Sequence, residues 1–155
     1  MSGVPRLTRG DILRWLKEND RVRLAQLWEW ADAVRHEFVG DEVHLRGLIE
    51  FSNYCSRQCA YCGLNARNAE VVRYRMSADE ILACAHQAVG FGYGTVVLQS
   101  GEDYGVTREW LGEVVRRIKA ETPLAVTLSV GERTEADLAY WKDCGADRYL
   151  LRFET

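Results

Sequence analysis

The chain has 155 residues, of which 47% are hydrophobic and 28% charged, and its 20 Lys and Arg against 23 Asp and Glu leave a formal net charge of −3. These proportions are typical of a foldable globular chain, and the longest unbroken apolar run, Ile81 to Ala85, is far below the ~20 residues that a membrane span needs. The acidic balance argues against a nucleic-acid partner, and the first residues, MSGVPRLTRGDILRW, lack the apolar stretch of a secretion signal, so the sequence predicts a cytoplasmic protein without a membrane segment.

Two amphipathic helices are predicted before the first strand. Thr8 is placed to cap a short helix that runs to about Asn19, and apolar residues recur at helical spacing over residues 24–38. We therefore expect residues 1–40 to form an N-terminal helical extension and residues 41–155 to form the main fold.

Beyond Gly40, predicted strands and helices alternate. The strands are expected at Val43 to Phe51, Thr95 to Gln99, Leu124 to Ser129 and Arg148 to Phe153. The helices between them are expected to begin at the capping residues Ser77, Thr107 and Thr134. Strand, loop and helix in strict order imply right-handed crossovers and a parallel sheet. The sequence thus predicts an α/β fold, a parallel (β/α) barrel truncated to four of the roughly eight strands that a complete barrel has.

Three polar, glycine-rich segments follow predicted strands: SNYCSRQCAYCG, SGEDYG and VGERT. Because ligands bind at the carboxyl ends of parallel strands, we expect these loops to converge on one edge. There, Glu102 follows Gly101, which lets the backbone come close, and its carboxylate can pair with an ammonium group; the alternative is a solvated loop acid. Asp103 and Arg133 are candidates for a salt bridge at the strand ends, and Gln99 for a polar residue inside the barrel mouth.

The five cysteines are an odd number in a chain without an export signal, so we do not expect a disulfide framework. Cys55, Cys59 and Cys62 have the spacing CxxxCxxC. Three thiolates on one loop can hold three corners of a [4Fe-4S] cube and leave the fourth iron open to a substrate or cofactor. A structural zinc site completed by a fourth ligand stays an alternative. Cys84 and Cys144 are expected to be small packing residues.

The cysteine motif, with the aromatic Tyr61 before its last cysteine, resembles the signature of radical S-adenosylmethionine (radical SAM) enzymes, whose fold is a full or partial (β/α) barrel. Further blocks, from about Ile49 to the last residue, are similar to those of the HydE branch of this family, the [FeFe]-hydrogenase maturases: IEFSNYCSRQCAYCGL, RYRMS, VLQSGED, LSVGER and RYLLRFET. Biotin synthase and methylornithine synthase have the same cysteine spacing and stay alternatives.

The resemblance implies a set of cofactor-binding residues. The three cysteines of the motif would hold a [4Fe-4S] cluster, at which S-adenosylmethionine is cleaved to a 5′-deoxyadenosyl radical. Tyr61 would lie beside the adenine, and Glu154 would bind the ribose hydroxyls. Ser100, Gly101 and Glu102 stand where the family has GGE, with serine for the first glycine, and Glu102 would bind the ammonium of the methionyl moiety. Ser129 would line the cavity.

The resemblance to HydE also implies partners. The substrate would be a small organometallic iron species that carries carbonyl, cyanide and cysteine, passed on from the maturase HydG and processed for the hydrogenase active-site cluster. A flavodoxin or ferredoxin would supply electrons. Half a barrel makes a poor closed chamber for a radical, so a noncatalytic module that only carries an iron-sulfur cluster stays an alternative.

Overall fold

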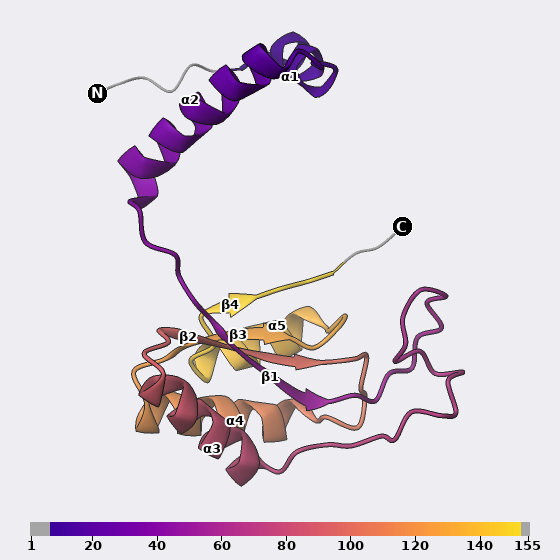
Figure 1. Ribbon diagram of the computed structural model, residues 1–155. Helices are drawn as coiled ribbons and strands as arrows, with labels where there is room; N and C mark the ends of the chain where they lie inside the picture. The colour runs from indigo at the N-terminus through magenta and orange to yellow at the C-terminus, as the bar shows by residue number, and fades with distance from the viewer. Residues whose placement is uncertain (1–6, 153–155) are drawn as a thin grey trace. The chain divides into compact units, whose positions relative to one another are not determined.

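The computed structural model describes residues 7–152 and falls into two compact units, of which the first ends at Val43 and the second begins at His44 (Figure 1). All strands in the described part of the chain belong to the second unit. The candidate site is therefore built from the second unit alone.

The first unit consists of two helices, α1 (Arg9–Leu16) and α2 (Arg21–Val39), and no residue of either helix is buried. The predicted cap at Thr8 is confirmed, since its hydroxyl and backbone form a capping box with the first turn of α1. The helix ends before Asn19, because the Glu18 carboxylate accepts the next two backbone N–H groups and starts the turn into α2. Within the described residues, no helix combines the length and the hydropathy that crossing a membrane requires.

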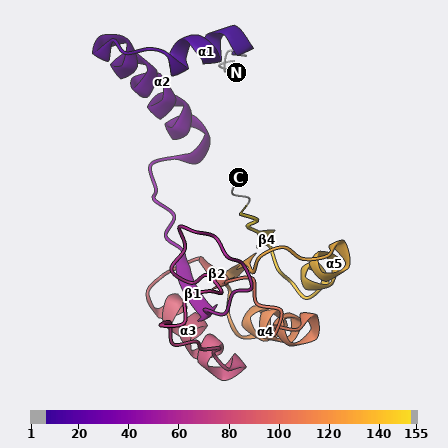
Figure 2. The same cartoon turned by 90° about the vertical axis from the view of Figure 1, so that its right-hand side faces the viewer.

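The second unit is a parallel sheet with helices on one face (Figures 1 and 2). Its strands, in spatial as in chain order, are β1 (Gly47–Ser52), β2 (Thr95–Ser100), β3 (Ala125–Ser129) and β4 (Arg148–Tyr149). The connecting helices are α3 (Ala78–Gly90), α4 (Arg108–Glu121) and α5 (Glu135–Asp143), capped as predicted by Ser77, Thr107 and Thr134. The predicted α/β fold is confirmed, as an open sheet compatible with a truncated barrel.

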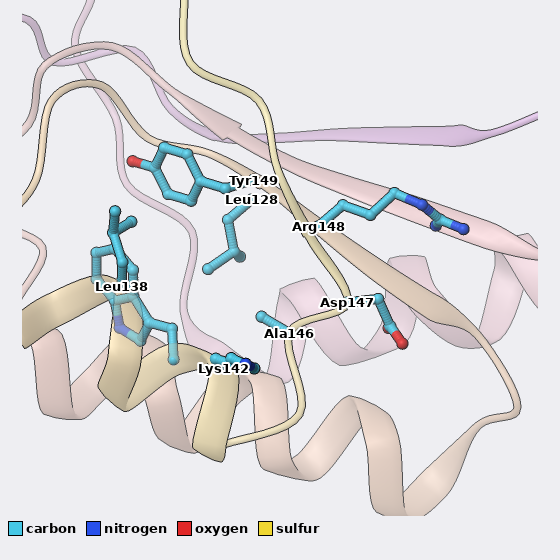
Figure 3. Close-up of a pocket in the computed structure, with 8 residues that line it drawn as sticks. Leu128, Leu138, Lys142, Ala146, Asp147, Arg148 and Tyr149 are labelled. Atoms are coloured by element: carbon cyan, nitrogen blue, oxygen red, sulfur yellow. The ribbon is translucent and has the colours of Figure 1, made fainter. Parts of the chain in front are cut away.

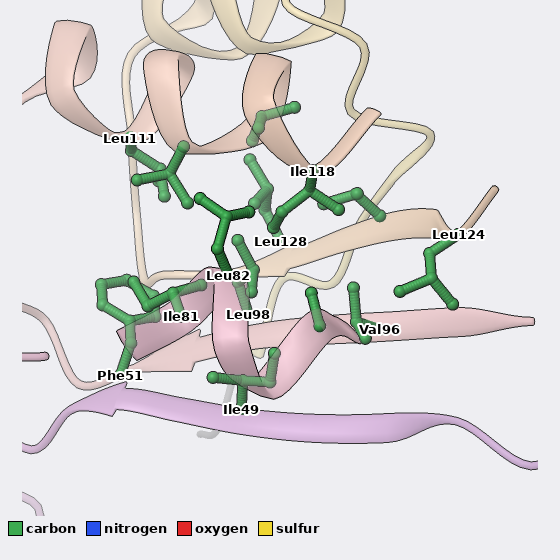
Figure 4. Close-up of a cluster of buried hydrophobic side chains, with 14 of the residues drawn as sticks. Ile49, Phe51, Ile81, Leu82, Val96, Leu98, Leu111, Ile118, Leu124 and Leu128 are labelled. Carbon is green, nitrogen blue, oxygen red and sulfur yellow. The ribbon is translucent and has the colours of Figure 1, made fainter. Parts of the chain in front are cut away.

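The hydrophobic core lies between the sheet and these helices (Figure 4). Side chains alternate along each strand, so every second residue points to the helices. The buried hydrophobic residues of the strands are Ile49, Phe51, Val96, Leu98, Val126 and Leu128. They pack against buried helix residues that include Ile81, Leu111 and Ile118. This layer holds the strand ends, and hence the loops that follow them, in fixed positions.

The opposite face of the sheet carries the intervening strand residues. Leu48 is 57% exposed there, as expected for the inner face of an open barrel. The Gln99 amide donates to the Glu50 carboxylate (2.8 Å) and accepts from the Arg152 guanidinium (2.9 Å). Gln99 thus makes polar contacts on the face away from the helices, and its place inside a barrel mouth stays a prediction.

Two predicted strands are shorter than expected. β1 begins at Gly47, not Val43. Gly47 pairs with Val96, the second residue of β2, so β2 extends only one residue farther back and Val43 has no strand residue opposite it. β4 ends at Tyr149, because its partner β3 stops one residue beyond the position that pairs with Tyr149. The predicted end of that strand, Phe153, lies outside the described residues.

A substitution at Trp141 can test which residues form the hydrophobic core. Its side chain is 1% exposed, its ring stacks on Tyr149 with centroids 6.4 Å apart, and its Nε1–H donates to the Arg108 carbonyl (2.9 Å). We expect Trp141→Ala to lower the free energy of unfolding by about 3–5 kcal/mol, because the buried ring leaves a cavity. The control is Trp28→Ala at a position that is 63% exposed, where we expect a change of about 0.5 kcal/mol or less. Urea unfolding followed by circular dichroism measures both, and equal losses would contradict the assigned core.

Candidate functional site

The cysteine loop, defined as residues 53–74, leaves the carboxyl end of β1 and returns to it. At its base, the Asn53 N–H donates to the Tyr74 carbonyl (3.3 Å) and the Met76 N–H donates to the Phe51 carbonyl (2.7 Å). These antiparallel bonds close the loop against the first strand. The loop is therefore anchored at both of its ends.

Arg73 organises the interior of the cysteine loop. Its Nη1 donates to the carbonyls of Asn53 and Leu64, and its Nη2 donates to the carbonyls of Asn65 (2.8 Å) and Asn68 (3.4 Å). The planar guanidinium presents several N–H donors in a fixed fork, which a lysine ammonium does not offer. One side chain thus satisfies four backbone carbonyls and fixes the segment that follows the third cysteine.

The cysteines of the CxxxCxxC motif are partly exposed free thiols, whereas Cys84 and Cys144 belong to the hydrophobic core or pack against it, as predicted. Within residues 7–152, no three His, Cys, Asp or Glu side chains converge on a single metal ion, as the ligands of a structural zinc do. A [4Fe-4S] cube places each thiolate on a different iron, so its ligands lie farther apart. Three soft thiolates on one partly exposed loop fit that cluster chemically.

The loop after β2 lies directly against the first cysteine. The Glu102 N–H donates to the Cys55 sulfur (3.4 Å), and the Ser56 N–H donates to the Glu102 carbonyl (3.0 Å). Gly101 allows this approach, since a Cβ there would lie 2.4 Å from the Tyr54 carbonyl oxygen. Hydrogen bonds to a cluster's sulfurs are one means by which proteins set its reduction potential. The predicted convergence of these two loops is confirmed.

The Glu102 carboxylate is held by the loop after β3. Its side chain is 8% exposed, so the alternative of a solvated loop acid is wrong. Oε1 accepts the Glu132 N–H (2.9 Å) and the Tyr104 hydroxyl (3.3 Å). Gly131 has a φ of +83°, and a Cβ there would lie 2.3 Å from Glu102 Oε2. The third loop thus forms a cradle for this carboxylate.

Arg57 links the same three loops through charge. Its Nη2 lies 2.7 Å from Glu132 Oε2 and 3.7 Å from Glu102 Oε1. The negative charge of Glu132, and next that of Glu102, raises the pKa of the Arg57 guanidinium, which therefore stays protonated. Arg57 is 46% exposed, so water screens both ion pairs and each contributes little to stability.

Asp103 has a structural role. Its side chain is 2% exposed and accepts the Ser52 hydroxyl (2.6 Å) and both the Nε (2.7 Å) and Nη2 (2.8 Å) of Arg75. Burial pushes the pKa of Asp103 up, but the hydrogen bonds from Arg75, Ser52 and the Gly105 N–H outweigh it and lower the pKa. The predicted salt bridge exists, but its partner is Arg75. The prediction that Arg133 pairs with the Asp103 carboxylate is wrong, because the Arg133 guanidinium donates to backbone carbonyls of the loops after β2 and β3.

The remaining predicted contact residues are spread over the same edge. Ser100 and Ser129 are the last residues of β2 and β3, and the Ser100 hydroxyl donates to the Gly101 carbonyl (2.8 Å). Tyr61, directly before the third cysteine, is 70% exposed. Glu154 lies outside the described residues. The contacts of these residues with S-adenosylmethionine stay predictions.

Arg73 and Arg75 organise the site, but neither is among the residues predicted from the sequence. The sequence pattern that could have indicated them is the alternation R-Y-R, because in an extended segment it places both guanidinium groups on the same side. The acceptors of Arg73 are backbone carbonyls of an irregular loop, which no pattern of side chains reveals.

A pocket of about 200 Å³ lies between α5 and β4, and no residue of the cysteine loop lines it (Figure 3). Its walls are mostly apolar. Its one carboxylate, Asp147, accepts the Val126 N–H (2.7 Å) and the Lys119 ammonium (3.1 Å). Burial raises the pKa of Asp147, but these bonds outweigh burial and lower it. Because this acid is already paired, we assign no chemistry to the pocket.

Residues 49–155 match the family model of the Radical SAM superfamily. The chain is 47% identical over 148 residues to the [FeFe] hydrogenase maturase subunit HydE of Thermotoga maritima, across 96% of this chain and 42% of that protein. It is 33% identical over 151 residues to the 3-methylornithine synthase of Methanosarcina acetivorans, across 96% and 43%. The crystal structure of methylornithine synthase (PylB) superposes with a TM-score of 0.85 at 33% identity, across 96% and 44%. The chain thus spans less than half the length of these relatives.

The role of the Arg73 guanidinium in ordering the cysteine loop can be tested by Arg73→Lys. A lysine keeps the charge but cannot hold four carbonyls in fixed directions, so we expect amides of the cysteine loop, such as that of Ala66, to exchange with solvent about ten-fold faster, which corresponds to about 1.4 kcal/mol. Hydrogen exchange read by mass spectrometry measures this. Arg67→Lys, at an exposed arginine of the same loop, is the matched control. Equal exchange in both variants would show that Arg73 does not order the loop.

The Asp103 pair predicts a pH dependence. Because the pKa of Asp103 is lowered on folding, its charged form stabilises the protein above the ordinary value of 3.8, and this stability is lost as the pH falls through the lower folded-state value. We expect Asp103→Asn to lower the free energy of unfolding by about 1–3 kcal/mol near neutral pH, with a difference from the wild type that shrinks below pH 3.8. Urea unfolding across this range measures it, with the exposed Asp143→Asn as control. A difference that stays constant into strong acid would contradict the assigned ion pair.

Proposed function

The chain belongs to the radical SAM superfamily, and from that premise we propose that it is a HydE-like maturase acting in the assembly of the [FeFe]-hydrogenase active-site cluster. The observation that carries the proposal is the contact of the SGED loop with the cysteine loop, which brings the Glu102 backbone to the Cys55 sulfur. The identity to HydE, higher than that to 3-methylornithine synthase, supports the maturase branch.

We assign cluster binding to Cys55, Cys59 and Cys62. When bound, such a [4Fe-4S] cluster supplies one electron for the cleavage of S-adenosylmethionine into methionine and a 5′-deoxyadenosyl radical. The protein's own part is to hold the loop in shape through Arg73 and to direct the Glu102 N–H at one ligand sulfur. An N–H at the sulfur offsets negative charge and favours the reduced state.

We assign S-adenosylmethionine binding to the residues that follow the strand ends. They are Tyr61, Ser100, Gly101, Glu102, Ser129 and Glu154. The argument is strongest for Glu102, because its carboxylate is almost fully buried and is fixed by the Glu132 N–H and by the lack of a side chain at Gly131. A fixed, desolvated carboxylate favours a charged partner such as the ammonium of the methionyl moiety.

The proposed substrate and partners follow from the maturase branch. They are a small organometallic iron species received from HydG and a flavodoxin or ferredoxin that supplies electrons. The second candidate function is that of a methylornithine or biotin synthase, and the TM-score of 0.85 to methylornithine synthase favours it. The third candidate is a cluster carrier without catalysis.

Anaerobic reconstitution with iron and sulfide tests the proposal. We expect about four iron atoms per chain and an electron paramagnetic resonance signal of the reduced cluster that S-adenosylmethionine perturbs, since the ligand enters at an open iron. Serine at Cys55, Cys59 or Cys62 is expected to abolish stable incorporation, whereas the control Cys84→Ser keeps it. These four variants remove the same kind of atom from different places in the fold.

The outcomes separate the candidates. A signal that S-adenosylmethionine leaves unchanged indicates a cluster carrier, and one zinc without iron indicates a zinc scaffold. Release of 5′-deoxyadenosine with 3-methylornithine as a product would favour the synthase. The spectroscopic signal, not the rate of turnover, decides whether the chain binds S-adenosylmethionine.

A further inference from the structure

The guanidinium of Arg57 is shared between two carboxylates of very different exposure. Glu102 is 8% exposed and lies 3.7 Å away, while Glu132 is 70% exposed and lies 2.7 Å away. Arg57 itself is 46% exposed. The cation thus lies beside the buried acid but makes its shorter contact with the exposed one.

This position conflicts with a second cation at Glu102. Two positive groups on one carboxylate repel each other, and the repulsion is strong where the acid is shielded from water. The Glu102 carboxylate cannot readily move away, because it packs against Gly131 and accepts hydrogen bonds from the Glu132 N–H and the Tyr104 hydroxyl. Arg57, half exposed on the cysteine loop, is the group that has room to move.

We propose that Arg57 is a cationic gate on the ammonium position: it neutralises Glu102 in the free protein and is held by Glu132 alone when a ligand ammonium binds to Glu102. This inference rests on the proposed binding of S-adenosylmethionine. Glu132 suits the second role because its side chain already binds Arg57 while its backbone N–H holds Glu102. One residue therefore fixes the buried acid and retains the displaced cation.

The proposed gate predicts opposite changes in the affinity for S-adenosylmethionine when Arg57 and when Glu132 is substituted. Arg57→Gln removes the competing charge, so we expect the reconstituted protein to bind S-adenosylmethionine about two- to five-fold more tightly, the size of effect that a partly exposed ion pair has. Glu132→Gln leaves Arg57 with Glu102 as its only carboxylate, so we expect binding to weaken by a similar factor. Arg57→Lys keeps the charge and should resemble the wild type.

The double variant tests whether the two effects are coupled. If Glu132 acts only by retaining Arg57, then Glu132→Gln changes the affinity in the wild type but not in the Arg57→Gln background. Equilibrium dialysis of S-adenosylmethionine against preparations matched in iron content measures all four proteins. 5′-Methylthioadenosine, which lacks the ammonium group, is the control ligand, and its affinity should be the same in each.

Three results would overturn the gate alone: weaker binding of S-adenosylmethionine by Arg57→Gln, an effect of Glu132→Gln that persists in the Arg57→Gln background, or loss of iron uptake in Arg57→Gln. The last would assign Arg57 to holding the cysteine loop. A wild-type protein that takes up its cluster but binds no S-adenosylmethionine would overturn the proposed function, and the gate with it.

Discussion

The structure of the candidate site depends on one close backbone contact, that of the Gly101–Glu102 peptide with Cys55. Because Gly101 has no side chain, the loop after β2 can lie against the cysteine loop, so that one N–H reaches a sulfur. The same residue sends its carboxylate toward the loop after β3, where Gly131 leaves room for it. Glu102 therefore joins three loops through one backbone and one side chain, and the parallel sheet beneath brings those loops to a single edge.

The cysteine loop lacks secondary structure for most of its length, so its order must come from side chains. Arg73 orders the interior of the loop by donating hydrogen bonds to four backbone carbonyls. Arg75, directly after the loop, pairs with the buried Asp103. These two arginines act on different parts: Arg73 holds the segment after the third cysteine, and Arg75 ties the end of the cysteine loop to the loop after β2. A loop held in this way presents its thiols without enclosing them.

Sequence patterns predicted what depends on local chemistry. Capping residues such as Ser77 and Thr134 marked helix starts correctly, since a cap involves residues only three apart. Motif spacing likewise identified the cysteine loop. The partner of Asp103 was missed, because Arg75 reaches it only after the loop has folded back on β1. Strand ends were missed for a similar reason, since a strand's length depends on its pairing with a neighbour, and only Arg148 and Tyr149 of β4 pair with β3.

Glu102 and Asp103 are adjacent buried acids that differ in how firmly their cations are held. This difference bears on which of them we propose as a ligand site. Asp103 is saturated: a hydroxyl, a backbone N–H and a bidentate guanidinium occupy its two oxygens. A ligand could displace Arg75 only by unmaking the anchor of the cysteine loop. Arg57, the cation beside Glu102, lies 3.7 Å from its Oε1 and makes a shorter contact, of 2.7 Å, with a second carboxylate, that of Glu132. Of these two buried acids, we therefore propose Glu102 as the one that receives a ligand, because its cation has a second carboxylate to bind and that of Asp103 anchors the cysteine loop.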